Sequence, residues 1–231
     1  MQIRELILDT ETTRLDPASG DRIVEIGCVE IINSISTGRT FHVYLDPERD
    51  VPDEAFRIHG LSREFLTGKP RFADIVTDLL EFLEEAQLVI HNADFDMKFI
   101  NAELSRCGAP AISMNRVVDT LALARRKHPG VSNSLDALCA RYKIDNTRRT
   151  KHGALLDAEI LAEVYAELQG GRQKAFELAN VAVKNVKVTN FDPIDFQRAN
   201  PLGLLLTTDE NLAHNAFLDK MGEKALWTMY F

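Results

Sequence analysis

Two acidic residues stand two positions apart near the N-terminus, in the segment Asp9-Thr10-Glu11. The continuous apolar run that leads to them, from Glu5 to Asp9, has strand length and suits a central strand covered on both faces. Because side chains alternate along a strand, both carboxylates project from one face. The two carboxylates repel one another unless a cation lies between them, so a metal site is one interpretation of the pair. A turn carrying two solvated acids is the alternative interpretation.

A third acid is Asp96, in the segment Asn92-Ala93-Asp94-Phe95-Asp96. If a helix begins near Asp94, Asp96 shares a face with Phe99 and Ile100, three and four residues further on. A carboxylate directed at apolar neighbours needs a partner. For Asp94 we adopt a simpler role, stabilisation of the helix N-terminus.

A histidine and a fourth acid stand five positions apart, His152 and Asp157. Asp157 has the same unusual environment as Asp96, because Ile160 and Leu161 belong to the apolar stripe of its predicted helix. A lone histidine is more often structural than catalytic. His152, however, lies in a polar, glycine-flanked stretch, residues 148–153, that we interpret as a mobile loop.

Four carboxylates from one strand end and two helices form an all-oxygen set, which Mg²⁺ and Mn²⁺ prefer and zinc does not. Such a set can hold two cations ~3.5–4 Å apart, one lowering the pKa of an attacking water and the other stabilising a leaving oxygen. A neutral imidazole with a pKa near ~6.5 can take the proton of that water. We therefore predict two Mg²⁺ or Mn²⁺ ions held by Asp9, Glu11, Asp96 and Asp157, with His152 as general base.

The elements that must position these residues alternate between strand and helix patterns. Three strands with short connections indicate an antiparallel meander, and helices and strands then alternate, so we expect a mixed five-stranded sheet with flanking helices. The expected strands are 5–9, 22–33, 39–45, 87–91 and 116–119, with a turn at 34–38. The expected helices are 73–86, 94–107, one opened by Asn133 or Ser134, and 154–168.

The segment after residue 170 differs in character from the part before it. Gly170-Gly171 should end the last helix, and periodicity fades through residues 171–205, which we interpret as a linker. Helical character returns within residues 206–231, from Thr208 to Trp227. A short detached helix is marginal alone, so we interpret it as a docking element for a partner. Residues 1–170 then form the catalytic domain.

The composition excludes some classes of protein. The chain has 231 residues and a formal net charge of -8, which argues against binding duplex DNA through a broad basic face. Its three cysteines are far apart and without a CxxC pair, so reduced thiols are expected rather than a disulfide or zinc site. No apolar stretch has the length of a signal peptide core or a membrane span. We expect a cytoplasmic protein that binds no membrane.

Taken together, these blocks resemble the DnaQ-like DEDDh family of 3′–5′ exonucleases. The likeness covers roughly residues 3 to 170 and extends to stretches such as FHVYLDP, IHGLS, VIHNADFD, NSLDALCARYKIDN and HGALLDAEILAEVY. It implies an RNase H-like fold, the four acids as metal ligands, and Glu11 and His152 as catalytic residues. The implied substrate is the single-stranded 3′ end of DNA, and the implied role is proofreading. An exoribonuclease of the same fold and a non-catalytic scaffold are the alternatives.

The resemblance also suggests substrate-binding residues. Thr10 and Thr12 would lie along the terminal nucleotide, and Phe95 would stack against the last bases. We add Asn92, His59 and His152 to this set, while a packing role remains open for His59 and for His91. Asp119 is expected to cap a helix and Asp136 to face solvent. Arg14 stands where the family commonly has glycine, so the turn after the first strand should differ.

Partner binding is expected beyond the catalytic domain. The resemblance implies that the tail, with the lone Trp227, binds the alpha subunit of a bacterial DNA polymerase III, since exposed aromatic residues are frequent anchors at interfaces. The segment from Gln173 through Phe176 to Leu178 is a loose match to a peptide that binds the sliding clamp. A simple linker is the alternative for that segment.

Overall fold

The computed structural model describes residues 3–149, 151–170 and 207–221. The chain divides into two compact units, Met1–Leu178 and Ala179–Phe231. In the second unit the described residues form one helix, α8 (Thr208–Met221), none of whose residues is buried. The predicted residues Gln173, Phe176, Leu178 and Trp227 lie outside the described residues, as does the whole of the expected linker, residues 171–205.

The first unit is built around a five-stranded sheet with the strand order β3-β2-β1-β4-β5. Strands β1 (Arg4–Thr12), β2 (Ile23–Ile32) and β3 (Ile35–Tyr44) pair antiparallel. Strands β4 (Gln87–Ile90) and β5 (Val117–Asp119) extend the sheet in parallel with β1. The predicted mixed sheet with an antiparallel meander is therefore confirmed.

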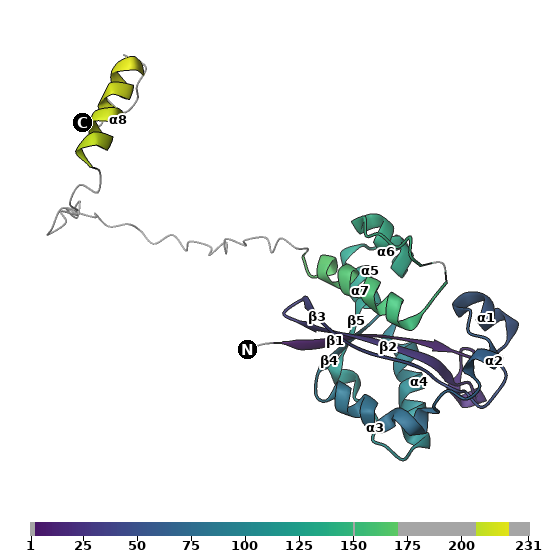
Figure 1. Ribbon diagram of the computed structural model, residues 1–231. Coiled ribbons are helices and arrows are strands. Elements are labelled where there is room, and N and C mark those ends of the chain that lie inside the picture. Colours follow the sequence, from purple (N-terminus) through teal and green to yellow (C-terminus); the bar gives the residue numbers. More distant parts are fainter. Residues whose placement is uncertain (1–2, 150, 171–206, 222–231) are drawn as a thin grey trace, which may run out of the picture. The chain divides into compact units, whose positions relative to one another are not determined.

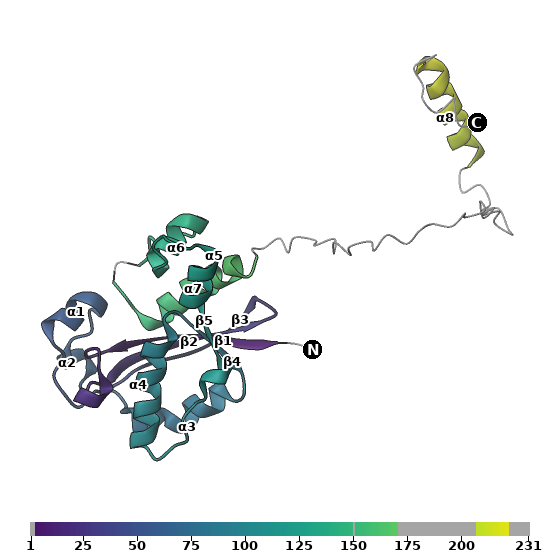
Figure 2. The same ribbon diagram turned by 180° about the vertical axis from the view of Figure 1, so that it is seen from behind.

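Helices cover both faces of this sheet (Figures 1 and 2). Helices α3 (Phe72–Leu83) and α4 (Ala93–Arg106) lie on one face. Helix α7 (Ala154–Leu168) lies on the other, with α5 (Thr120–Lys127) and α6 (Leu135–Tyr142) packed against it. The bounds of α7 agree with the predicted helix.

Four shorter helical segments complete the first unit. Helices α1 (Asp53–His59) and α2 (Arg63–Leu66) connect the meander to α3. The single turns η1 (Pro17–Ser19) and η2 (Met114–Arg116) follow β1 and precede β5. None of the four was predicted, because such short helices offer too few turns for a 3.6-residue period to show. For α5 the sequence predicted only the cap at Asp119 and no bounds.

The alternation of side chains along β1 decides where its polar end points. Leu6 and Leu8 pack with the α3 and α4 core, whereas Ile7 packs with Ala158 and Leu161 of α7. By the same alternation, the side chains of Asp9 and Glu11 continue the α7 face and Thr10 continues the α4 face. The end of β1 thus presents polar groups to both helices.

The predicted turn at residues 34–38 was wrong. The chain reverses at Asn33 and Ser34, which both have positive φ, 52° and 65°, as a two-residue hairpin turn requires. Strand β3 begins at Ile35. Gly38, which has a φ of 81°, lies at a register shift between β2 and β3. Glycine here marks a bulge, not a loop.

None of the helices in the described part of the chain has both the length and the apolar character needed to span a bilayer.

Candidate active site

Asp9 and Glu11 lie near the carboxyl end of β1, opposite Gly27 and Glu25 of β2. Burial, followed by the negative charges of Asp157, Glu25 and Asp96, raises the pKa of Glu11 to about 8. Burial and the charges of Asp96, Glu11 and Asp157 likewise raise the pKa of Asp9. The two carboxylates predicted to share a face therefore do so, at a point where negative charge accumulates.

Asp96 comes from the first turn of α4 and is only 3% exposed. Its Oδ1 accepts hydrogen bonds from the backbone N–H of Thr10 at 3.1 Å and from the Thr10 hydroxyl at 2.7 Å. Burial raises the pKa of Asp96 to about 7, although these hydrogen bonds favour its ionised form. The inward orientation predicted from helix periodicity is confirmed, and Thr10 provides a partner.

Asp157 reaches the same place because α7 packs closely on β2 at a glycine. A Cβ atom at Gly27 would lie 2.2 Å from the backbone carbon of Ala154 and 2.2 Å from the nitrogen of Leu155. No side chain fits there, so the first turn of α7 rests directly on the strand. Asp157, one turn further on, is 3% exposed and directed toward the end of β1.

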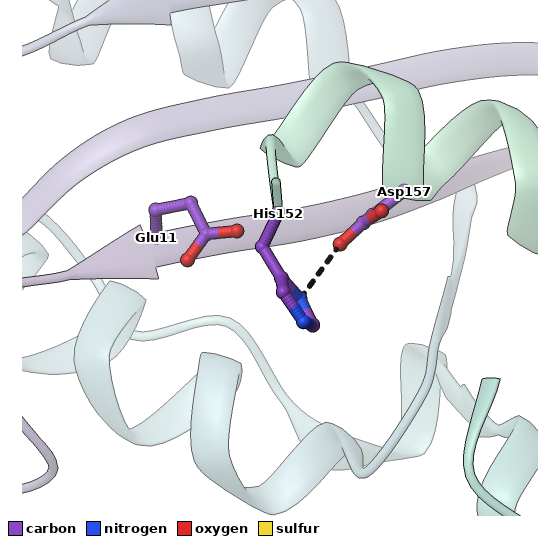
Figure 3. Close-up of side chains that lie close together, drawn as sticks. All are labelled: Glu11, His152 and Asp157. Carbon is purple, nitrogen blue, oxygen red and sulfur yellow. Dashed lines mark ion pairs between the residues drawn. The ribbon is translucent and has the colours of Figure 1, made fainter. Parts of the chain in front are cut away.

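His152 approaches the acids from the loop before α7. Figure 3 shows its ring between Glu11 and Asp157, and ligand atoms of these three residues all lie within 4.8 Å of one another. Its Nδ1 lies 3.2 Å from Asp157 Oδ2, and its backbone N–H donates to the carbonyl of Ile58 at 3.1 Å. The imidazole is 47% exposed, so it is open to a ligand.

Arg149, which the sequence did not single out, is the nearest cation to this cluster in the described part of the chain. Its side chain is only 7% exposed, and its Nε and Nη2 lie 2.5 and 2.7 Å from the two carboxylate oxygens of Asp157. Its positive charge lowers the pKa of both Asp9 and Glu11. An arginine three residues before His152 was the available signal, but its partner on α7 could not be inferred from spacing.

Glu25 is a second residue that sequence analysis missed. It is 3% exposed, faces Glu11 across the β1–β2 ladder, and its Oε1 lies 2.8 Å from Nε2 of His42 on β3. An acid within a largely apolar strand was the available signal, since buried acids are rarely left without a partner. Glu25 adds negative charge beside the predicted ligands.

The predicted substrate-binding residues line two adjoining pockets. One pocket is lined by residues that include Thr10, Thr12, His59 and Phe95. The other contains the acids and His152, and it also includes Asn92. Thr10, Glu11 and Phe95 line both, so the pockets meet at the end of β1. Arg14 is exposed at the edge of the first pocket.

His59, His91 and Asp119, which sequence analysis also considered, each make hydrogen-bond contacts within the fold. His59 is buried, and its Nδ1 accepts from the backbone N–H of Leu61 at 3.0 Å; burial lowers its pKa to about 4. His91 Nδ1 lies 2.9 Å from the hydroxyl of Thr120. Asp119 caps α5 through the N–H of Leu121, as predicted.

Asp136 and Asn92 lie at the edges of the cluster. The side chain of Asp136 is 62% exposed, as predicted, and it also pairs with Arg149. Asn92 precedes α4 with a φ of 66°, and its N–H donates to Asp119 at 3.2 Å. This left-handed backbone, which asparagine tolerates well, ends β4 and starts α4 within two residues.

The donor set fits a divalent cation. Within the described residues, Asp157 Oδ1 is buried and makes no hydrogen bond, because its contact with Arg149 Nε is short but poorly aligned. Burial and the neighbouring negative charges raise the pKa of Asp9 and Glu11, and burial raises that of Asp96. A bound cation would relieve the repulsion among these carboxylates. Carboxylate oxygens are the ligands that Mg²⁺ and Mn²⁺ prefer.

Comparison with known proteins identifies a matching family and similar proteins. Residues 6–165 match the family model described as exonuclease. The chain is 47% identical over 222 residues to a Rickettsia felis protein named DNA polymerase III subunit epsilon, covering 95% of this chain and 97% of the relative. It is 44% identical over 236 residues to the Escherichia coli protein of that name, covering 97% of each.

A solved structure supports the fold. The structure of exonuclease X in complex with 5′ overhanging duplex DNA has a TM-score of 0.56 and 26% identity to this chain, and the match covers 71% of this chain and 90% of the other. The RNase H-like exonuclease fold expected from the sequence is therefore confirmed.

Proposed function

Because the chain belongs to the exonuclease family, and its curated relatives are named DNA polymerase III subunit epsilon, we propose that it is the proofreading 3′–5′ exonuclease of a replicative DNA polymerase. Its substrate is the single-stranded 3′ end of DNA, from which it hydrolyses terminal nucleotides. The relatives are matched over nearly their whole length, so the proposal concerns the entire chain.

One observation carries this proposal: acids from β1, α4 and α7 meet beside His152. Asp9, Glu11, Asp96 and Asp157 would hold two Mg²⁺ or Mn²⁺ ions. A pair of such ions activates water and stabilises a leaving oxygen. Because His152 is half-exposed and borders Glu11, it would take the proton of the attacking water.

The protein's own groups position the reactants. Thr10 holds Asp96 by two hydrogen bonds, which fixes α4 against the end of β1. The pocket lined by Thr12, His59 and Phe95 adjoins the acids and would receive the terminal nucleotide. The ring of Phe95 is available there as a stacking surface, a contact that tolerates every base.

The second unit is assigned to partner binding. Helix α8 exposes Leu212, Phe217 and Met221. An apolar surface of this kind on a short helix is suited to docking on another protein. We assign residues 206–231, with Trp227, to the alpha subunit of the polymerase, and Gln173, Phe176 and Leu178 to the sliding clamp. Residues 171–205 would serve as the linker, and 1–170 as the catalytic domain.

The activity is tested with a 3′-mismatched DNA primer and an RNA oligomer of equal length. With Mg²⁺, the protein should trim the DNA from its 3′ end and the RNA much more slowly. EDTA and Asp9→Ala should each abolish trimming, whereas Asp78→Ala, an exposed acid on α3, should not. Metal-independent or internal cutting would contradict the proposal.

The same assay separates the two alternatives. Faster trimming of RNA would support the exoribonuclease. Absence of trimming with retained polymerase binding would support a scaffold. Deleting the residues after 180 should leave single-strand trimming intact and abolish co-purification with the polymerase. Loss of trimming in that truncation would mean that the tail completes the catalytic domain.

A further inference from the structure

Arg149 contacts three functional groups at once. Its Nη2 lies 2.7 Å from Asp157 Oδ2 and 2.6 Å from Nδ1 of His152, and its Nη1 lies 2.7 Å from Oδ1 of Asp136. Nε completes a forked contact with Asp157. Of these partners, Asp157 and His152 belong to the proposed active site, whereas Asp136 lies on α6 at its edge.

A guanidinium and a divalent cation need the same oxygen atoms of Asp157. The fork of Arg149 lies against both of them, and the contact at Oδ1 lacks hydrogen-bond geometry. Cation binding at either oxygen would place a second positive charge against the guanidinium, which is always protonated. The two cations therefore exclude one another at this carboxylate.

The contact with His152 extends this conflict to the base. Arginine carries only donors, so Nδ1 of His152 accepts from Arg149, and the proton of the neutral ring lies on Nε2. In that tautomer Nε2 cannot take a proton from water. Without Arg149, Nδ1–H can donate to Asp157 Oδ2, 3.2 Å away, and Nε2 becomes a free acceptor.

We propose that Arg149 competes with the active-site metal for Asp157 and, until displaced, holds His152 in the tautomer that cannot act as base through Nε2. Arg149 is thus a positioning residue that makes the base available only when the metal is bound. Its contact with Asp136, whose side chain is exposed, can hold the displaced guanidinium at the rim of the site. This inference rests on the proposed metal-dependent function.

Calorimetric titration of the full-length protein with Mg²⁺ tests the competition. Arg149→Met should bind Mg²⁺ roughly tenfold more tightly than wild type, a difference of about 1.4 kcal/mol. Arg149→Lys, which keeps the charge, should lie closer to wild type. Arg148→Met, at an exposed neighbouring arginine, should bind as wild type does. Equal or weaker binding by Arg149→Met overturns the proposal.

Measuring which ring nitrogen of His152 carries the proton is a second, independent test of the proposal. In ¹⁵N-histidine spectra of wild type, the His152 signals, assigned with His152→Gln, should report Nε2–H in EDTA and Nδ1–H with Mg²⁺. Arg149→Met should show Nδ1–H even in EDTA. An unchanged wild-type tautomer refutes the inference even if the Met variant fails to fold. If wild type binds no Mg²⁺ at all, the proposed function itself fails.

Discussion

Gly27 of β2 lies directly opposite Asp9 of β1, and the backbone of α7 fills the space where a side chain at residue 27 would lie. The absence of a Cβ atom therefore brings the helix that carries Asp157 down onto the strand beside Asp9. Two acids from distant parts of the chain meet because one residue between them has no side chain.

Gly27→Ala should reduce exonuclease activity by about 10²-fold or more, because misplacement of a reactive group by ~1 Å has this effect. The new Cβ would meet the backbone of Ala154 and Leu155 at 2.2 Å, so the first turn of α7 must move. Single-turnover trimming measures the loss, and thermal unfolding shows how much of the variant is folded.

Gly153→Ala is the matched control for this substitution. Gly153 has an extended backbone, with a φ of −157°, and its nearest neighbour for a new Cβ is Glu25 Oε2 at 4.0 Å. The cost should be limited to a weaker N-cap, about 1 kcal/mol of stability. Equal loss of activity in both variants would contradict the close-packing explanation.

Stability without metal should decrease as the pH rises. Burial and like charges raise the pKa of Glu11 to about 8 and that of Asp96 to about 7, above their ordinary values of 4.5 and 3.8. Between those values the native state holds protons that the unfolded chain has released, so the free energy of unfolding falls with increasing pH. His59, with a pKa lowered to about 4, acts in the opposite direction below about pH 6.5.

The test is therefore the melting temperature in EDTA from about pH 6.5, the ordinary pKa of histidine, up to about pH 8.5. Wild type should lose stability across this range, and Glu11→Gln should lose less, since one of the protons involved is gone. Mg²⁺ should stabilise wild type more at the higher pH. A slope that is identical in Glu11→Gln would show that Glu11 does not hold a proton there.

His152→Ala should lower kcat by about 10²–10⁴-fold, the usual contribution of a general base. Binding of Mg²⁺ should persist, because the carboxylates remain. His214→Ala is the control, since His214 is exposed on α8. Quenched-flow trimming gives the rates and calorimetry the affinities. A variant that keeps most of its activity would remove His152 from the mechanism.

Thr10→Val should weaken metal binding and reduce trimming by about tenfold, the equivalent of roughly one charge-assisted hydrogen bond. Valine keeps the shape of threonine but cannot donate to Asp96, whose Oδ1 the Thr10 hydroxyl contacts at 2.7 Å. Thr40→Val, at an exposed position on β3, should leave both quantities unchanged. Unaltered Mg²⁺ affinity in Thr10→Val would argue against a supporting role for this hydroxyl.

Those parts of the site that follow local periodicity were predictable from the sequence. The shared face of Asp9 and Glu11 follows from strand alternation, and the inward direction of Asp96 and Asp157 follows from helix spacing. The bounds of α7 were predictable for the same reason, because its apolar stripe is long. Each of these features is fixed by residues of a single strand or helix.

What could not be predicted depends on contacts between distant segments. Arg149 belongs to a stretch interpreted as a mobile polar loop, yet it pairs with Asp157 and Asp136 and its side chain is only 7% exposed. The need for glycine at residue 27 arises only once α7 packs on β2. The turn at Asn33-Ser34 was missed because glycine, the stronger turn signal, marks a bulge at Gly38 instead.

The backbone hydrogen bond from His152 to Ile58 links two walls of the site that are far apart in sequence. A second link reinforces it, because the ammonium of Lys151 lies 4.7 Å from the ring centre of Phe56. Helix α1, which carries Phe56 and Ile58, also lines the pocket next to the acids. Because these two contacts join α1 to the backbone beside His152, a strand end that displaced α1 on binding would also displace the backbone that carries the imidazole.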